Sequence, residues 1–234
     1  MQIIMMILNN AFFIVEWVVI FQIVDSIGGY GFNKTMLIWA VSAGGFGVAH
    51  TFFNSEWDIS NKVYDGKLDV FLTQSKNVLL NVCCLSTNVS AMGDFFYAFV
   101  VLAIIGAPAW WFLAVIPVLI LSGILYTAVC VTFSSISFYI KKGEAVANVV
   151  EGAFMQSANY PPAIFNTVVK GILFTIVPVF FFTFIPAQYI FLTFNIWWLL
   201  GYAGVVALWV VIAFVVFHLG LKRYNSGNLT GGRL

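Results

Sequence analysis

The chain has 234 residues, of which 62% are hydrophobic, 18% aromatic and only 8% charged. Soluble globular domains carry about 25% charged residues, so this composition excludes a soluble protein and indicates a membrane protein. The formal net charge of +1 gives no basis for nucleic-acid binding. The three cysteines, of which Cys83 and Cys84 are adjacent, suggest neither a disulfide framework nor a metal site.

Two long stretches without Lys, Arg, Asp or Glu set the class of fold. They cover residues 95–140 and 171–221, and only His218 interrupts the second. Each is roughly twice as long as a helix that crosses a ~30 Å hydrocarbon core at about 1.5 Å per residue. Each therefore predicts an out-and-back pair of helices. We expect an all-α membrane protein with six transmembrane helices in a single domain over residues 1–234.

The first half of the chain predicts three of these spans. Span one covers about 3–24, with no cleavable signal and no amphipathic segment ahead of it, and span two covers about 35–54. Residues 55–94, which we call the polar arm, hold eight charged residues together with apolar residues at helical spacing. This pattern predicts an amphipathic helix and an elbow. Span three begins between residues 87 and 95 and ends at Gly106.

The second half predicts three more spans. Span four covers about 112–139, and a second polar connection at 141–170 is broken by Pro161 and Pro162. Span five covers about 168–186, is interrupted by Pro178 and ends near Pro186. An aromatic-rich connection leads to span six at about 199–220, and a short polar tail follows. Because proline removes backbone hydrogen bonds that lipid cannot replace, we expect a broken or re-entrant outer segment between spans five and six.

The distribution of basic residues predicts the orientation. With six spans, nine of the ten Lys and Arg residues fall on one side, and only Lys34 falls on the other. By the positive-inside rule the rich side is cytoplasmic, so both termini are expected there. Four tryptophans fall at the opposite boundary, as an aromatic belt does. They are Trp110, Trp111, Trp197 and Trp198.

Few residues inside the expected spans could carry chemistry. His50 and His218 fall near cytoplasmic span ends, where hydrated boundary histidines are common. Glu16 is the one acid within an expected span, where an ionised carboxylate costs at least ~2.5 kcal/mol. Asn9 lies seven residues earlier and shares its helix face. The pair predicts a translocation pathway or a dimer seam, with a hydrogen-bonded packing role as the alternative.

The polar arm predicts a docking site. An interfacial helix lying on lipid is the alternative, but anionic lipids favour a clear basic excess. The arm interleaves three lysines with five acids, which suits a protein partner better. The chain has no nucleotide-binding loop of the Gly-x-x-x-x-Gly-Lys-Ser/Thr kind, so a partner must supply any energy from ATP.

Three segments resemble motifs of one family of membrane proteins. Tyr64–Leu72 resembles the Gly-x-Leu-Asp-x-x-Leu element of type-2 ABC exporter permeases, and Ser134–Tyr139 is similar to the Ser-x-x-Phe-Trp end of span four in that family. Asn159–Phe165, followed by Leu173–Phe180 and Ile185–Ala187, resembles its Tyr-Pro, Pro-x-x-Phe and Pro-Ala elements. The chain departs from the family's basic-Pro dipeptide at Gln74-Ser75 and from its Arg at Asn159.

The resemblance implies a permease subunit of the bacterial inner membrane that is not itself an enzyme. Its partners would be an ABC ATPase and a second permease copy or a sister permease. The ATPase would bind ATP and Mg, and this chain would hold no cofactor. The loop between spans two and three would supply the coupling helix that contacts the ATPase. The residues mapped to this contact are Asp58, Lys62, Tyr64, Gly66, Leu68, Asp69 and Leu72.

The outer end of span five is rich in phenylalanine. Pro178, Phe182 and Pro186 predict a hydrophobic outer gate for an amphipathic substrate, with lipid-facing filler as the alternative. The function that we expect is export driven by a separate ATPase, with the substrate open. An ion-gradient-driven secondary transporter and a non-transport membrane scaffold or immunity protein are the alternatives.

Overall fold

The computed structural model describes residues 1–56, 58–140, 143–192 and 195–224, and within them the fold is all helical, with no β-strand. Lys141, Lys142 and Arg233, which the charge count uses, lie outside the described residues. The α-helices are α1 (Gln2–Ile23), α2 (Phe32–Phe52), α3 (Ile59–Tyr64), α4 (Asp69–Leu72), α5 (Val78–Cys83), α6 (Met92–Ile104), α7 (Ala109–Ser134), α8 (Gly143–Ser157), α9 (Thr167–Thr175), α10 (Val179–Phe182) and α11 (Ile196–Leu221). Short 3-10 or π turns are η1 (Val89–Ala91), η2 (Ser135–Phe138), η3 (Pro162–Ile164) and η4 (Pro186–Leu192).

The all-α membrane fold is confirmed. Four helices are long and apolar enough to cross a membrane: α1, α2, α7 with η2, and α11. A fifth candidate is α9 with the helical residues 179–188, which bends by 63°. The segment made of η1 and α6 is apolar but shorter. Each expected span therefore has a helical counterpart, while the total of six crossings stays a prediction.

Helix α2 is the centre of the bundle. In its most apolar window 83% of the residues are buried, against 11% for α1 and 17% for α11. Its glycines make this possible. A Cβ at Gly47 would lie 2.4 Å from the backbone nitrogen of Phe95 on α6, and a Cβ at Gly45 would lie 2.7 Å from the ring of Phe182. On α7, Gly123 leaves the same kind of room for Val48 of α2.

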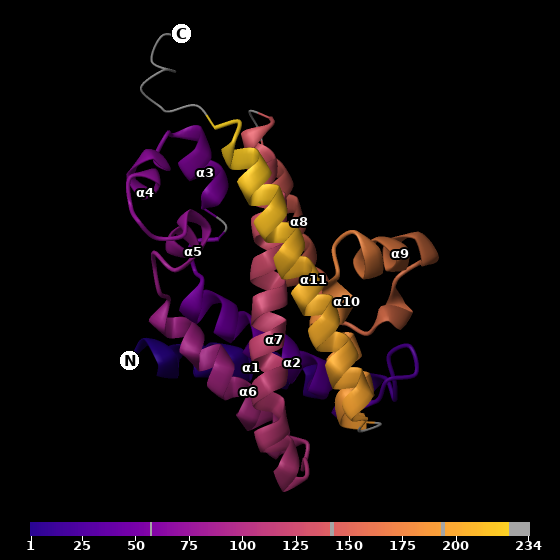
Figure 1. The fold of residues 1–234 in the computed structure, drawn as a ribbon. Helices are drawn as coiled ribbons and strands as arrows, with labels where there is room; N and C mark the ends of the chain where they lie inside the picture. Colours follow the sequence, from indigo (N-terminus) through magenta and orange to yellow (C-terminus); the bar gives the residue numbers. More distant parts are fainter. Residues whose placement is uncertain (57, 141–142, 193–194, 225–234) are drawn as a thin grey trace.

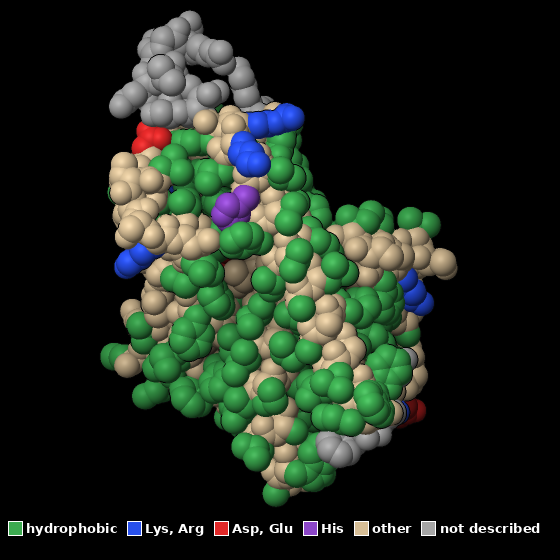
Figure 2. All heavy atoms as spheres, in the orientation of Figure 1, with side chains coloured by type: hydrophobic (Ala, Val, Ile, Leu, Met, Phe, Trp, Pro, Cys, Tyr) green, Lys and Arg blue, Asp and Glu red, His purple; other side chains and the backbone are tan. Residues whose placement is uncertain are grey.

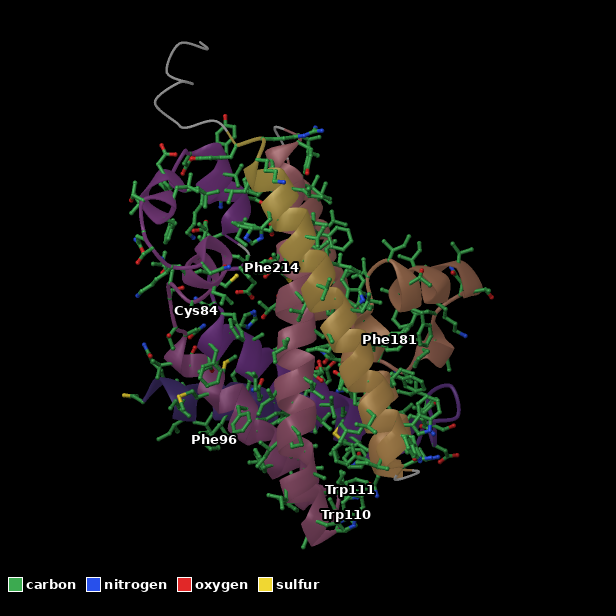
Figure 3. The ribbon with its side chains drawn as sticks, in the orientation of Figure 1. Cys84, Phe96, Trp110, Trp111, Phe181 and Phe214 are labelled. Atoms are coloured by element: carbon green, nitrogen blue, oxygen red, sulfur yellow. The ribbon has the colours of Figure 1, made fainter. Side chains whose placement is uncertain are left out.

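The long axis of the molecule follows α7 and α11, which run side by side in Figure 1 while α1 lies across the lower half of the bundle. Trp110 and Trp111, both labelled in Figure 3, lie at the lower end of α7. Trp197 and Trp198 begin α11 at that same end and are exposed. The polar arm lies at the opposite end, so the tryptophans and the arm mark opposite ends, as the sequence predicts.

The sequence predicts an amphipathic helix and an elbow in the polar arm, and the structure instead divides the helical part of the arm. It folds into three short helices, α3, α4 and α5, because Gly66 turns the chain at a φ of +71° directly after α3. The inner faces of the arm form a second hydrophobic cluster with α7 and α11. Leu68 and Val82 of the arm and Phe217 of α11 are fully buried in it.

The expectation that the connection at 141–170 lies wholly on one side of the membrane is wrong. Helix α8 turns back along α7, so that the ring of Phe154 contacts Tyr126, about two thirds of the way along that helix. The chain that follows reaches the turn between α1 and α2, where Gly28 would place a Cβ 2.3 Å from that of Ala163. Two segments in contact cannot lie on opposite sides. Lys170, which lies in α9 a few residues after this contact, is therefore a poor marker of orientation.

The predicted break near Pro178 is present. Helices α9 and α10 meet there at the 63° bend. A second proline, Pro186, leaves the carbonyl oxygen of Phe182 without a helical donor, and the Ser122 hydroxyl of α7 donates to it at 2.9 Å. The same hydroxyl lies 2.8 Å from that of Tyr202 on α11. One serine thus links α7, α10 and α11.

The glycine contact between α2 and α6 can be tested by adding a single methyl group. Gly47→Ala meets backbone atoms that cannot rotate away, so we expect a loss of about 1–3 kcal/mol in stability. Thermal unfolding in detergent measures this loss as a lower midpoint. Gly204→Ala on α11 is the control, because nothing lies within 4 Å of its added Cβ. Equal midpoints for the two variants would contradict close packing at Gly47.

Candidate functional site

The outer surface of the polar arm carries apolar side chains that nothing in the described chain covers. Tyr64 is 75% exposed and Val70 63%, and Leu72 is also exposed. Beside them Lys67 pairs with Asp65, with Nζ and Oδ2 2.6 Å apart. An apolar patch rimmed by charged residues is typical of a protein interaction site.

Other residues assigned to the ATPase contact face the interior of the arm. Leu68 is fully buried, and Lys62 is buried beside Asp58, with which it forms an ion pair. Gly66 supplies the turn after α3. Within the described chain, Asp69 lies near Tyr224, which follows α11. These residues hold the arm in shape, and the exposed patch of Tyr64, Val70 and Leu72 is the part that a partner can reach.

Glu56, which no sequence pattern singles out, is completely buried where α2 leads into the arm. Neither carboxyl oxygen has a hydrogen-bond partner among the described residues. Burial raises the pKa of Glu56 from 4.5 to about 8, and negative charge on nearby Glu151 of α8 acts in the same direction. The carboxyl group is thus held protonated at neutral pH, at the point where the arm joins the bundle.

A polar pocket of about 180 Å³ lies among α1, α2, α6 and the end of α8. Its lining combines hydrogen-bonding groups with aromatic and thioether side chains. The lining residues are Met6, Asn10, Trp39, Ser42, Ala43, Phe46, His50, Asp94, Met155 and Asn159. The Ser42 hydroxyl is buried and has no hydrogen-bond partner within the described chain. A concave site with a few convergent polar groups is the usual form of a small-molecule site.

A chain of hydrogen bonds holds one wall of this pocket. The indole nitrogen of Trp39 donates to the Tyr97 hydroxyl at 3.1 Å, and that hydroxyl donates to the Asn10 carbonyl oxygen at 2.9 Å. The Asn10 amide nitrogen then donates to an Asp94 carboxyl oxygen. Since one amide bond leaves most of the acceptor capacity of a carboxyl group unused, Asp94 can accept a further donor from the pocket.

The structure gives the buried polar role on α1 to Asn10 rather than to Asn9 and Glu16, which are both exposed. Asn9 and Glu16 are seven residues apart, and so are Asn10 and Trp17, which are the two buried residues of α1. Both pairs share a helix face, and an almost wholly apolar helix gives no signal for which face is inward. The seam or pathway role of Asn9 and Glu16 stays a prediction.

The residues of the expected outer gate lie in the core. Pro178 and Pro186 are buried, and Phe182 is fully buried. The Phe182 ring packs 4.8 Å from that of Phe46, and its carbonyl oxygen meets Ser122, midway along α7. Phe182 therefore sits at the middle of the bundle rather than at its outer end, and its role as a gate remains a prediction.

The bond between Asn10 and Asp94 can be tested by a pair of neighbouring variants. Asn10→Leu leaves a buried carboxyl group without its donor, so we expect a loss of about 1–3 kcal/mol. Asn9→Leu makes the same chemical change at an exposed position and should leave stability unchanged. The readout is the thermal unfolding midpoint in detergent. A larger loss for Asn9→Leu would mean that α1 packs on its other face.

The pKa of Glu56 predicts how stability depends on pH. The folded protein holds this proton more tightly than the unfolded chain, so the contribution of Glu56 is complete below pH 4.5 and declines as pH rises towards 8. The slope is about 1.4 kcal/mol per pH unit in that range. Glu56→Gln keeps the shape of the side chain and cannot ionise, so it should flatten the slope. Unfolding midpoints between pH 5 and 8 measure it, and an unchanged slope would contradict the burial of Glu56.

Comparisons with known proteins bear on the whole chain. No curated protein and no solved structure matches it. Residues 5–228 match the family described as ABC-2 family transporter protein. This match covers nearly the full length and includes the polar arm, the pocket and the broken segment. The chain therefore belongs to the ABC-2 family of transporters and is a multi-pass membrane permease of ABC-type transport.

Proposed function

We propose that this chain is the permease subunit of an exporter that moves its substrate outward across the bacterial inner membrane. A separate ABC ATPase binds ATP and Mg and hydrolyses the nucleotide. A second copy of this chain, or a sister permease, completes the transmembrane unit. Both termini are cytoplasmic. Family membership supports this proposal, together with the lack of a phosphate-binding loop in the sequence and the form of the polar arm.

The observation that carries the proposal is the two-sided construction of the arm. Its outer surface presents Tyr64, Val70 and Leu72, and its inner surface packs Leu68 and Phe71 into the cluster with α7 and α11. A partner that moves the outer surface therefore moves the inner ends of two long helices. A lipid-bound helix would need no such connection.

The mechanism follows from these contacts. ATP-driven closure of two ATPase subunits displaces the arm, and the second cluster transmits the displacement to α7 and α11. Ser122 of α7 passes it to α10 through the Phe182 carbonyl oxygen. Phe182 packs against Phe46 of α2, the helix that supplies half of the residues lining the polar pocket. A continuous series of contacts thus joins the arm to the pocket.

The polar pocket is the part of the translocation pathway that this chain supplies. Its walls come from four different elements, so a relative movement of those elements changes its shape. Asp94 and Ser42 offer hydrogen-bonding atoms to a substrate, and Trp39 and Phe46 offer apolar surface. This combination suits an amphipathic substrate, as the aromatic content of the sequence also indicates.

The arm contact is tested with Val70→Asp in the purified complex with the ATPase. Val70 is exposed, so the substitution leaves the fold intact and places a charge in the contact. We expect the affinity for the ATPase to fall by roughly 30-fold, equivalent to about 2 kcal/mol for one central interface residue. ATP hydrolysis by the complex should fall in parallel.

Leu85→Asp is the matched control, because Leu85 is an exposed apolar residue just beyond α5 and outside the patch. Its affinity for the ATPase should equal that of the unmodified chain. If Val70→Asp binds the ATPase normally and Leu85→Asp does not, the contact lies elsewhere on the arm. ATP hydrolysis by the purified chain alone would refute the division of roles.

A further inference from the structure

An apolar crevice separate from the polar pocket opens on the surface between α5, α7 and α11. Its volume is about 220 Å³, and nearly all of its lining is apolar. The lining residues are Phe53, Leu79, Leu80, Cys83, Ile124, Thr127, Ala128, Val131, Val210, Ala213 and Phe214. Phe214, labelled in Figure 3, lies on α11 at the level of the polar arm. The polar arm thus covers one side of the crevice, and the two long helices α7 and α11 form its other sides.

The depth of the crevice places it in one leaflet. At about 1.5 Å per residue, Val210 and Phe214 lie roughly 21 and 27 Å from the tryptophan end of α11. On α7, Ile124 and Val131 lie roughly 22 and 33 Å from the same end. In a hydrocarbon core of ~30 Å, Val210, Phe214 and Ile124 belong to the half nearest the arm, and Val131 lies at its boundary. In the proposed orientation, on which this assignment rests, that half is the inner leaflet.

Basic residues continue the same face of α11 above the crevice. Val210, Phe214, His218 and Lys222 follow one another at intervals of four, which places them in one oblique row along the helix. The ring of His218 stacks on that of Phe214, with centroids 4.0 Å apart. Figure 2 shows Lys or Arg side chains and a histidine over this end of α11, above a green apolar surface. This row changes from apolar to basic towards the end of α11.

The two basic residues at the end of α11 are available to an anion. Lys222 and Arg223 are both exposed, and within the described chain neither forms an ion pair with a carboxylate. The Arg223 guanidinium lies 4.9 Å from the centre of the Tyr139 ring, which orients it without neutralising its charge. Basic residues beside a gap between transmembrane helices on the cytoplasmic side are a known form of site for anionic lipid head groups.

We propose that this crevice binds one acyl chain of an anionic phospholipid of the inner leaflet. The phosphate group lies against Lys222 and Arg223, with His218 beneath it, and the acyl chain lies along Phe214 and Val210. Because Leu79, Leu80 and Cys83 of α5 also line the crevice, the lipid fills the seam between the polar arm and the two helices that the arm contacts. The lipid is therefore a structural part of the connection between them.

The experiment is native mass spectrometry of the purified full-length chain with equal amounts of phosphatidylglycerol and phosphatidylcholine. We expect one phosphatidylglycerol to be retained in preference to phosphatidylcholine. The double variant Lys222→Gln, Arg223→Gln should lower this preference by about fivefold for each residue. Lys34→Gln, which removes a basic residue at the far side of the bundle, is the control and should keep the preference. Equal retention of the two lipids by the unmodified chain would overturn the proposal.

Binding of the acyl chain inside the crevice is tested with a variant at its rim. Val210→Trp fills the mouth of the crevice from a partly exposed position, and we expect it to abolish retention of the lipid. Val215→Trp adds the same bulk to an exposed residue of α11 that does not line the crevice, and should retain it. Ala128→Leu fills the crevice from α7 and should also abolish retention of the lipid. Retention by both filling variants would overturn the proposal, and binding of the ATPase, measured on the same samples, keeps this result separate from the proposed function.

Discussion

The close approach of α2 to α6 and α7 is the constraint on which the rest of the structure depends. In a bilayer, apolar contact alone gives little reason for helices to associate, so small residues that allow tight packing decide which helices meet. Gly45, Gly47 and Gly123 have this role here. They draw α2 into the centre, and the polar arm that follows α2 is thereby fixed against the inner ends of α7 and α11.

Hydrogen bonds between polar groups add to the glycine contacts in fixing the positions of the helices. Ser122 links α7 to the broken segment and to α11, and the series from Trp39 to Asp94 links α2, α6 and α1. In hydrocarbon a polar group without a partner costs several kcal/mol, so such contacts specify position more strictly than apolar packing does. Among the described residues several buried polar groups lack such a partner, and Glu56, at the junction of α2 and the arm, is the one that can ionise to a carboxylate.

The fold class and most helix boundaries could be predicted from the sequence, because the length of an apolar run is fixed by the thickness of the membrane. The break at Pro178 followed from the missing hydrogen bonds of proline. The path of α8 could not be predicted, since its polar composition resembles that of a loop and only its packing against Tyr126 draws it inward. The facing side of α1 was equally hidden, because a helix that is apolar all round gives no period to read.

In the polar arm, the sequence likewise does not predict which single residues are exposed. The motif resemblance predicts a partner contact on this segment, but it does not separate exposed from buried members. Leu68 belongs to the motif and to the interior, whereas Val70 is available to a partner. Charge patterning marks a segment as polar; only the tertiary fold decides which of its side chains face outward.

The loose attachment of α1 has a consequence for the route of a substrate. This helix forms one wall of the polar pocket through Met6 and Asn10, yet Asn10 and Trp17 are its two buried residues. Lipid would surround most of its surface. Of the two long helices in the pocket wall, α1 is far less buried than α2, at 11% against 83% of the most apolar window. Its displacement would therefore disturb less packing and would connect the pocket directly with the bilayer.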